Sequence, residues 1–306
     1  LDGMKFFADV VIRGTTPDAA LLSDFGSWGM GLIEPDRYVS LEIRDLALIG
    51  RREKSRAVVY GLPHANLLLD NVYIEGKSEN GIMPAGADLL ILRNVWINGG
   101  NQMPKDAPDH CVYNTAGFTN GEQNLPIEFQ VEGGAGWSCP VHVYKTRAKR
   151  SFFTGVHMLG SGNGAILDFQ NGGAARIEGV RFELLPVGVN ENVAIGLHSE
   201  RTGTVTVVAG NRNGPDTRVV QFGHPEYLDG DTEESDSYHH DPSSIEIIDS
   251  QVIFPPGQSP TFVNALPWVT GTIRGSSTVL PENTTFQGDW RCIDVPGRAD
   301  DCSLMP

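Results

Sequence analysis

The feature that most constrains the fold is a repeat of about 24 residues that recurs along the chain. Three segments superimpose on one another: VSLEIRDLALIG (39–50), ANLLLDNVYIEG (65–76) and ADLLILRNVWINGG (87–100). Each holds a short apolar strand, a polar pair and a second alternating strand that ends in glycine. A repeat of this size indicates a structure in which one supersecondary unit stacks on the next.

Later parts of the chain continue the pattern. Its further copies are KRSFFTGVHMLGSG (149–162), ARIEGVRFELLP (175–186) and SSIEIIDSQVIFPPG (243–257). Another strand lies between these copies, at 57–61, 81–85, 110–114, 140–145, 164–170, 192–198, 217–223 and 261–265. The period is too short for a propeller blade and lacks a leucine-rich consensus. It predicts an all-β, single-domain right-handed parallel β-helix over residues 1–306.

The repeat also predicts where the turns and loops lie. Asn71 and Asn94 occupy the same place in successive copies, and asparagine tolerates a left-handed backbone, so we expect them to stack in a ladder at one turn. The longest insertions, 98–109, 115–139 and 223–242, predict a groove on one side. Residues 224–242 form a loop insertion, and residues 281–306 form a C-terminal cap or tail.

Composition excludes some functions. Acidic residues outnumber basic ones, 38 to 23, which argues against a nucleic-acid partner. No segment is apolar for the 18 or so residues of a membrane helix, so we expect no membrane insertion. The first residues, LDGMKFFADVVIRG, lack the features of a signal peptide, so we expect any targeting segment to be already removed.

The four cysteines suggest two pairs. Cys292 and Cys302 bracket a short loop without a nearby histidine, which predicts a disulfide clamp. Cys111 and Cys139 lie 28 residues apart, one enlarged coil, and are either a disulfide between coils or two buried thiols. Disulfides favour an oxidising compartment, and we expect a secreted or periplasmic protein.

Two stretches carry a resemblance to a known superfamily. The segments VVIRGTTPDAALL and NVWINGGNQMPKDAPDHCVYNTAG resemble right-handed β-helix proteins such as pectate lyases, alginate lyases and alginate C5-epimerases. The resemblance spans roughly residues 10–270 and implies a polysaccharide-active protein. The Trp-Ile-Asp-His element of pectate lyases is absent, because Asn98 follows Trp96-Ile97. The paired aspartates of β-helical polygalacturonases are also absent, so no family residue is carried over.

We expect the chemistry on three consecutive coils. Lyases and C5-epimerases of uronates need a cation on the carboxylate, a base for the C5 proton and an acid. The candidate proton-transfer residues are His110, Tyr113, His142, Tyr144 and Asp168, and the candidate substrate-binding residues are Asp109, Lys145, Arg147 and Lys149. The substrate would be a uronic-acid-containing polysaccharide or oligosaccharide.

Side-chain alternation limits this assignment. In PVHVYK the valines should face the core, which turns His142 and Tyr144 outward together. In HCVYN an inward Val112 would place His110 inside as well, unless His110 belongs to the preceding turn. His110 is therefore interpreted either as a turn histidine or as a catalytic histidine. The segment KTRAKR is interpreted either as a solvated turn or as a set of cations that binds the substrate carboxylate.

Two other functions stay open. A glycoside hydrolase needs paired carboxylates, which Asp109, Glu128 and Asp168 could supply. A β-helical adhesin or carbohydrate-binding module would use the uneven loops without turnover.

The acidic insertion is either a calcium site or a solvated acidic loop. Its oxygen ligands for Ca²⁺ would be Asp229, Asp231, Glu233 and Asp236. The spacing is not that of an EF-hand.

Overall fold

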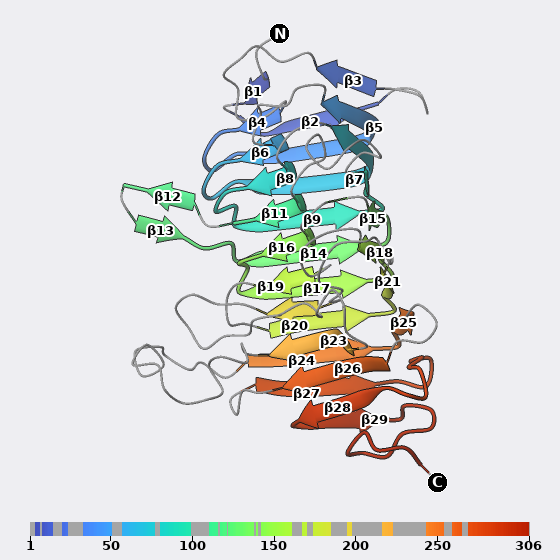
Figure 1. Cartoon of the computed structure of the whole chain (residues 1–306). Coiled ribbons are helices and arrows are strands. Elements are labelled where there is room, and N and C mark those ends of the chain that lie inside the picture. Colours follow the sequence, from blue (N-terminus) through green and yellow to red (C-terminus); the bar gives the residue numbers. More distant parts are fainter. Residues whose placement is uncertain are drawn as a thin grey trace. The chain divides into compact units, whose positions relative to one another are not determined.

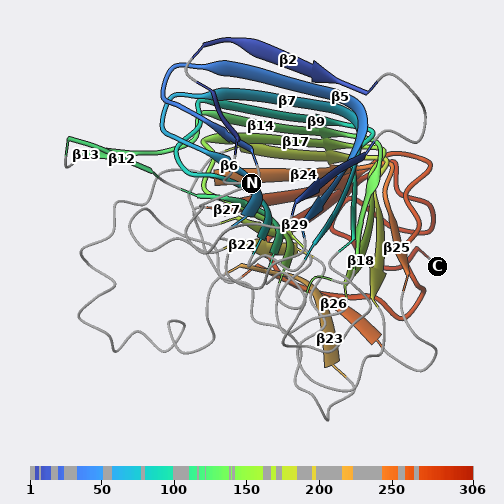
Figure 2. The same ribbon diagram turned by 90° about the horizontal axis from the view of Figure 1, so that it is seen from above.

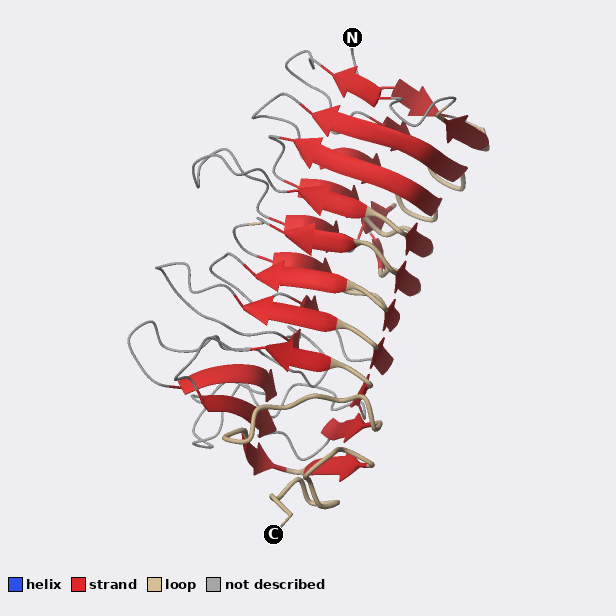
Figure 3. Ribbon diagram, turned by 90° about the vertical axis from the view of Figure 1, so that its right-hand side faces the viewer, coloured by secondary structure: helices blue, strands red, loops and turns tan. Residues whose placement is uncertain are grey.

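A computed structural model gives the fold, and its described residues form strands, turns and loops without any helix (Figure 3). The described residues are 4–6, 8–14, 20–23, 33–50, 57–76, 80–98, 110–115, 117–120, 122–137, 139, 142–160, 167–169, 174–184, 195–197, 216–222, 243–253, 259–264 and 269–305. The protein is therefore all-β, as the repeat predicts. The insertion 224–242 lies outside these residues.

The chain divides into two compact units, residues 1–149 and 150–306. The first contains β1 (Met4–Phe6), β2 (Val10–Arg13), β3 (Ala20–Ser23), β4 (Ile33–Pro35), β5 (Ser40–Gly50), β6 (Ala57–Gly61), β7 (Asn66–Gly76), β8 (Asn80–Pro84), β9 (Leu89–Arg93), β10 (Trp96–Asn98), β11 (His110–Asn114), β12 (Gly117–Thr119), β13 (Glu122–Asn124), β14 (Glu128–Glu132), β15 (Ala135–Trp137) and β16 (His142–Thr146) (Figure 1). The single-domain expectation stays a prediction.

Parallel pairing between successive repeats builds the first unit. One sheet runs β1-β4-β6-β8-β11-β16, and a second runs β5-β7-β9-β14 with β2 and β3 paired to β5. The short strands β10 and β15 continue from β7. Seen from above, β2, β5, β7, β9 and β14 lie one behind another (Figure 2). Only β12 and β13 form an antiparallel hairpin among the described strands of this unit.

The second unit repeats the pattern. It contains β17 (Arg150–Thr154), β18 (His157–Gly160), β19 (Leu167–Phe169), β20 (Ala174–Glu178), β21 (Arg181–Leu184), β22 (Ile195–Leu197), β23 (Asp216–Phe222), β24 (Ser243–Ile248), β25 (Gln251–Ile253), β26 (Ser259–Asn264), β27 (Val269–Arg274), β28 (Thr285–Gly288) and β29 (Trp290–Ile293). Its parallel series are β17-β20-β24-β27-β29, β18-β21-β25 and β19-β22-β23-β26-β28.

Inward-facing side chains stack in columns because the side-chain period of a strand is two. In the first unit one column is Leu41, Leu67, Leu90 and Phe129, and the next is Ile43, Leu69, Leu92 and Val131. Each of these side chains is at most 1% exposed. Burying one such side chain contributes about 1.5–3 kcal/mol, so each repeat is stabilised chiefly by its neighbours.

The predicted asparagine ladder is confirmed. Asn71 and Asn94 both have a left-handed backbone, with φ of 54° and 47°. The Asn94 amide donates to Asn71 Oδ1 over 3.1 Å, and the Asn71 amide donates to Asp45 Oδ1 over 3.0 Å. Asp45 also has a positive φ, 55°. The three residues lie 26 and 23 positions apart, which is the spacing of the repeat.

Both cysteine pairs are disulfides. Cys111 and Cys139, with Cα atoms 5.6 Å apart, form a disulfide rather than two buried thiols. Cys292–Cys302, with Cα atoms 4.9 Å apart, closes a loop at the C-terminus. Within the predicted cap, β28 and β29 extend the parallel sheets, so only the residues after Ile293 fold as a closing loop.

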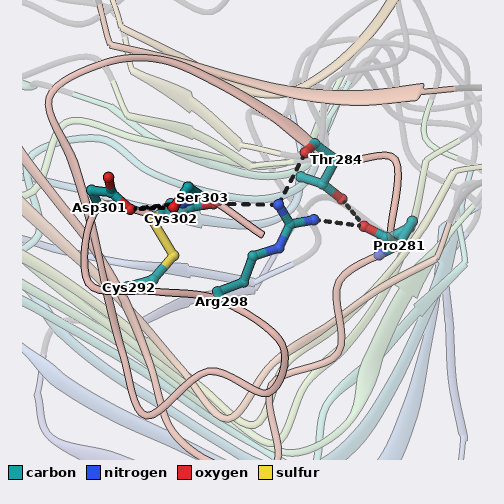
Figure 4. The surroundings of a disulfide bond; sticks show 7 residues. All are labelled: Pro281, Thr284, Cys292, Arg298, Asp301, Cys302 and Ser303. Atoms are coloured by element: carbon teal, nitrogen blue, oxygen red, sulfur yellow. Dashed lines mark hydrogen bonds between the residues drawn. A yellow bond between two sulfur atoms is a disulfide. The ribbon is translucent and has the colours of Figure 1, made fainter. Parts of the chain in front are cut away.

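A buried arginine organises this closing loop (Figure 4). Arg298 is 5% exposed, and its guanidinium donates to the main-chain carbonyl oxygens of Pro281, Glu282, Thr284 and Cys302. It also lies 5.5 Å from the ring centre of Phe286. Burial lowers the pKa of Arg298 from its ordinary value. The arginine and the disulfide thus fix the end of the second unit together.

Candidate functional site

Backbone register brings the predicted residues of two strands together on β11 and β16. His110 pairs with His142, and Tyr113 pairs with Lys145. Paired strands lie about 4.8 Å apart, so these four positions fall within the span of one sugar residue and its neighbour. The structure thus places two histidines, a tyrosine and a lysine at adjacent backbone positions of one sheet.

His110 and Tyr113 lie on the same side of β11 because the strand departs from strict alternation. Cys111 and Val112 are consecutive, and both are fully buried. The residues flanking them, His110 and Tyr113, are half-buried. Their rings meet edge-on with centroids 4.9 Å apart. Val112 is buried while His110 is only half-buried, with its Nδ1 shielded from solvent, so His110 lies neither wholly inside nor wholly outside.

The same irregularity overturns the expectation for Tyr144. Val143 and Tyr144 are consecutive and both fully buried, so Tyr144 does not face outward. Its ring packs 6.1 Å from that of Phe129, and its hydroxyl lies near Gly136, 3.6 Å from where a Cβ at that position would be. Burial raises the pKa of the Tyr144 hydroxyl well above its ordinary value. Tyr144 is a core residue and leaves the candidate site.

The remaining cations occupy the turn that follows β16. Arg147 is half-buried and Lys149 is exposed. The Arg147 main chain donates to the Asn114 carbonyl over 2.8 Å, and that of Lys149 donates to the Pro126 carbonyl over 3.1 Å. At about 3.3 Å per strand residue, this turn begins roughly 16 Å from His142. Lys145 is thus the predicted cation whose backbone lies beside the His110–Tyr113 pair.

The two described carboxylates proposed for a hydrolase, Glu128 and Asp168, belong to different units. Glu128 begins β14, which belongs to the other long sheet of the first unit, and it accepts a hydrogen bond from Gln130. Asp168 lies on β19 in the second unit, where its backbone pairs with Gly196. Asp109 lies outside the described residues.

The metal prediction also falls outside the described part of the chain, since Asp229, Asp231, Glu233 and Asp236 all belong to 223–242. Among the residues that are described, no group of three potential ligands is close enough to hold a metal ion. The described residues likewise contain no helix able to cross a membrane.

One neighbour of the pair escapes a reading of the sequence alone. Asn80 on β8 pairs with His110 from the other side and is 4% exposed. Its amide donates to Met83 Sδ over 3.6 Å. Asn80 stands 30 positions before His110, because the insertion after β10 lengthens that repeat. An alignment of strand 80–84 with strand 110–114 in the sequence would have placed Asn80 beside His110, whereas the average repeat length does not.

Comparisons with protein-family models, curated proteins and solved structures find no match.

Proposed function

We propose that the chain is a right-handed parallel β-helix that acts outside the cytoplasm as a lyase or C5-epimerase of a uronic-acid-containing polysaccharide. The fold proposal is supported by the parallel pairing of strands in successive repeats within both long sheets and by the ladder at a repeated turn. The two disulfides support an oxidising compartment.

The observation that carries the reaction is the His110–Tyr113 ring pair, with the backbones of His142 and Lys145 on the next strand. Both lyases and epimerases begin by removing the proton at C5 of a uronate. That proton becomes acidic when a cation neutralises the neighbouring carboxylate. Lys145 would supply the cation, and His110 would accept the proton, because histidine changes charge near neutral pH.

The second proton transfer decides the product. In β-elimination Tyr113 donates its phenolic proton to the oxygen leaving C4, the C4–O bond breaks and a C4=C5 double bond forms. In epimerisation the C4–O bond stays intact and a proton returns to the opposite face of C5. A base and an acid on one side of the substrate are enough for elimination, whereas epimerisation also needs a proton donor on the opposite face, from outside the His110–Tyr113 pair.

The test uses the complete chain with a panel of uronic-acid polysaccharides. Ultraviolet absorbance from unsaturated ends would report a lyase, and deuterium incorporation at C5 from heavy water would report an epimerase. We expect His110→Ala and Tyr113→Phe each to lower the rate about 100-fold or more. His157→Ala replaces another half-buried histidine, on β18, and should leave the rate unchanged.

Other outcomes would move the assignment. New reducing ends without absorbance would indicate hydrolysis instead. Glycan binding without absorbance, deuterium incorporation or reducing ends would favour a binding module or adhesin. Full activity in both the His110 and the Tyr113 variants would remove this site even if the reaction class held.

A further inference from the structure

A second cluster lies on the outer face of β7, β10 and β15 in the first unit. Ile74 and Ile97 are buried, so the residues on either side of them face outward. Backbone pairing arranges the cluster in two columns: Tyr73 and Trp96 in one, which ends at the buried Ala135, and Glu75, Asn98 and Trp137 in the other. The cluster is made from strands that share no residue with the His110–Tyr113 site.

Its polar part is a connected network. The Tyr73 hydroxyl donates to Glu75 Oε2 over 2.6 Å and accepts a hydrogen bond from the Asn98 amide over 3.3 Å. Partial burial and the hydrogen bond to Glu75 raise the pKa of Tyr73, so the hydroxyl stays protonated at neutral pH. The network therefore offers a carboxylate, a hydroxyl and an amide side by side at fixed positions.

Its apolar part is an indole that is held in place and still open to solvent. Trp96 Nε1 donates to Asn94 Oδ1 over 3.1 Å, which ties the ring to the asparagine ladder. Its other support is Trp137, with ring centroids 6.2 Å apart and planes at 77°. Even so, Trp96 is 45% exposed, whereas Trp290, which packs in the second unit, is 4% exposed.

An immobilised aromatic surface beside hydrogen-bonding groups matches a sugar ring, which has an apolar C–H face and a rim of hydroxyls. Because Trp96 is already held in place by Asn94 and Trp137, little side-chain entropy is lost when a ligand settles on it. The negative charge of Glu75 disfavours a sugar that carries its own carboxylate. The ligand that fits is therefore uncharged.

We propose that Trp96, Trp137 and the Tyr73–Glu75–Asn98 network bind a neutral sugar residue of a glycan, with the sugar ring stacked on Trp96. This site goes beyond the proposed reaction. It shares with it only the glycan as ligand class, and it uses none of the residues that would transfer protons. A glycan with both neutral and uronate residues could engage the two sites at once.

Calorimetric titration of the complete chain would test the proposal. The probes are the neutral hexasaccharides of cellulose, xylan, galactan and mannan, together with hexagalacturonate as the charged comparison. We expect at least one neutral probe to bind and Trp96→Ala to weaken it about tenfold or more. Tyr38→Ala is the matched control, because Tyr38 is also an exposed aromatic of the first unit, at 71%, and lies in a different turn.

A second variant tests the charge argument. Glu75→Gln keeps an acceptor for the Tyr73 hydroxyl and removes the negative charge, so it should narrow the preference for neutral over charged probes. The proposal is overturned if no neutral probe binds, if Trp96→Ala binds as tightly as the unaltered chain, or if hexagalacturonate binds best and competes at Trp96.

The two proposals fail separately. His110→Ala should abolish activity on polyuronates and leave the binding of neutral hexasaccharides unchanged. Trp96→Ala should weaken the binding of neutral hexasaccharides and leave activity on short uronate substrates unchanged. Circular dichroism of each variant would verify that the strands remain.

Discussion

The two units solve the same turn with different residues. In the first unit Asp45, Asn71 and Asn94 take three of the left-handed positions and their side chains bond to one another, while Gly133, opposite Asn94 on the next strand, takes the fourth with φ of 65°. In the second unit glycines take two of these positions, Gly155 and Gly179, with φ of 63° and 60°. The backbone bond is nevertheless alike, 2.7 Å from Asn94 to Glu132 and 2.8 Å from Gly179 to Ile248.

The difference separates two contributions to the turn. Glycine adopts a positive φ without steric cost but brings no side chain, whereas asparagine accepts some strain and gains hydrogen bonds between repeats. The second unit also uses Asp249, with φ of 44°, whose carboxylate accepts from the Ser277 main chain over 3.0 Å. The backbone geometry of the turn is the same with asparagine and with glycine. Substitutions can therefore compare what each residue contributes to the free energy of unfolding.

The largest effect is expected for Asn71→Ala, because Asn71 bonds in both directions along the ladder. The change removes two exposed side-chain hydrogen bonds and leaves a Cβ residue at positive φ. We expect a loss of about 2 kcal/mol in the free energy of unfolding, measured by urea denaturation. Asn71→Gly loses the same bonds without the strain and should cost clearly less. Equal losses for both would mean that strain contributes nothing at this turn.

Gly179→Ala isolates the strain. An added Cβ there meets nothing closer than the Gly155 nitrogen at 3.9 Å, so crowding contributes little. The left-handed backbone alone should cost about 1–2 kcal/mol. The same urea experiment measures it, and Gly155→Ala, where no atom lies within 4 Å, should give a matching value. A loss near zero would show that the turn relaxes to a negative φ.

The sequence predicted the ladder but not the inward pair in β16, and the reason is local. Asn71 and Asn94 recur at one place in a visible repeat, so stacking follows from the period. Tyr144 follows Val143 without any signal that both turn inward, since the Tyr144 ring packs on Phe129 and Val143 fills the space beside Gly136, both of which lie on other strands. The Trp96–Trp137 contact is hidden in the same way, because the hairpin of β12 and β13 separates the two residues in sequence.

Gly179→Asn would transfer the first unit's solution to the second. Asp249 follows Gly179 in this turn, whereas Asp45 precedes Asn71, so the new amide would donate in the opposite direction, to a carboxylate one strand spacing away that also accepts from the Ser277 main chain. One exposed hydrogen bond contributes about 0.5–1.5 kcal/mol, which offsets the cost of leaving glycine. We expect unfolding energies within about 1 kcal/mol of the unaltered chain and above those of Gly179→Ala. A value at or below that of the alanine variant would show that the ladder stabilises only its own unit.

The smallest effect is a pH dependence at the first rung of the ladder. Hydrogen bonds from Asn71 and Arg13 lower the pKa of Asp45 below its ordinary value of 3.8. Since the folded state holds the carboxylate more acidic than the unfolded state does, the contribution to stability is complete above the ordinary value. It is lost as the pH falls through the lowered one. Asp45→Asn should therefore lower the thermal midpoint slightly at pH 6 and lose that difference as the pH falls below 3.8 and through the lowered pKa. A deficit that grows in acid would contradict the sign.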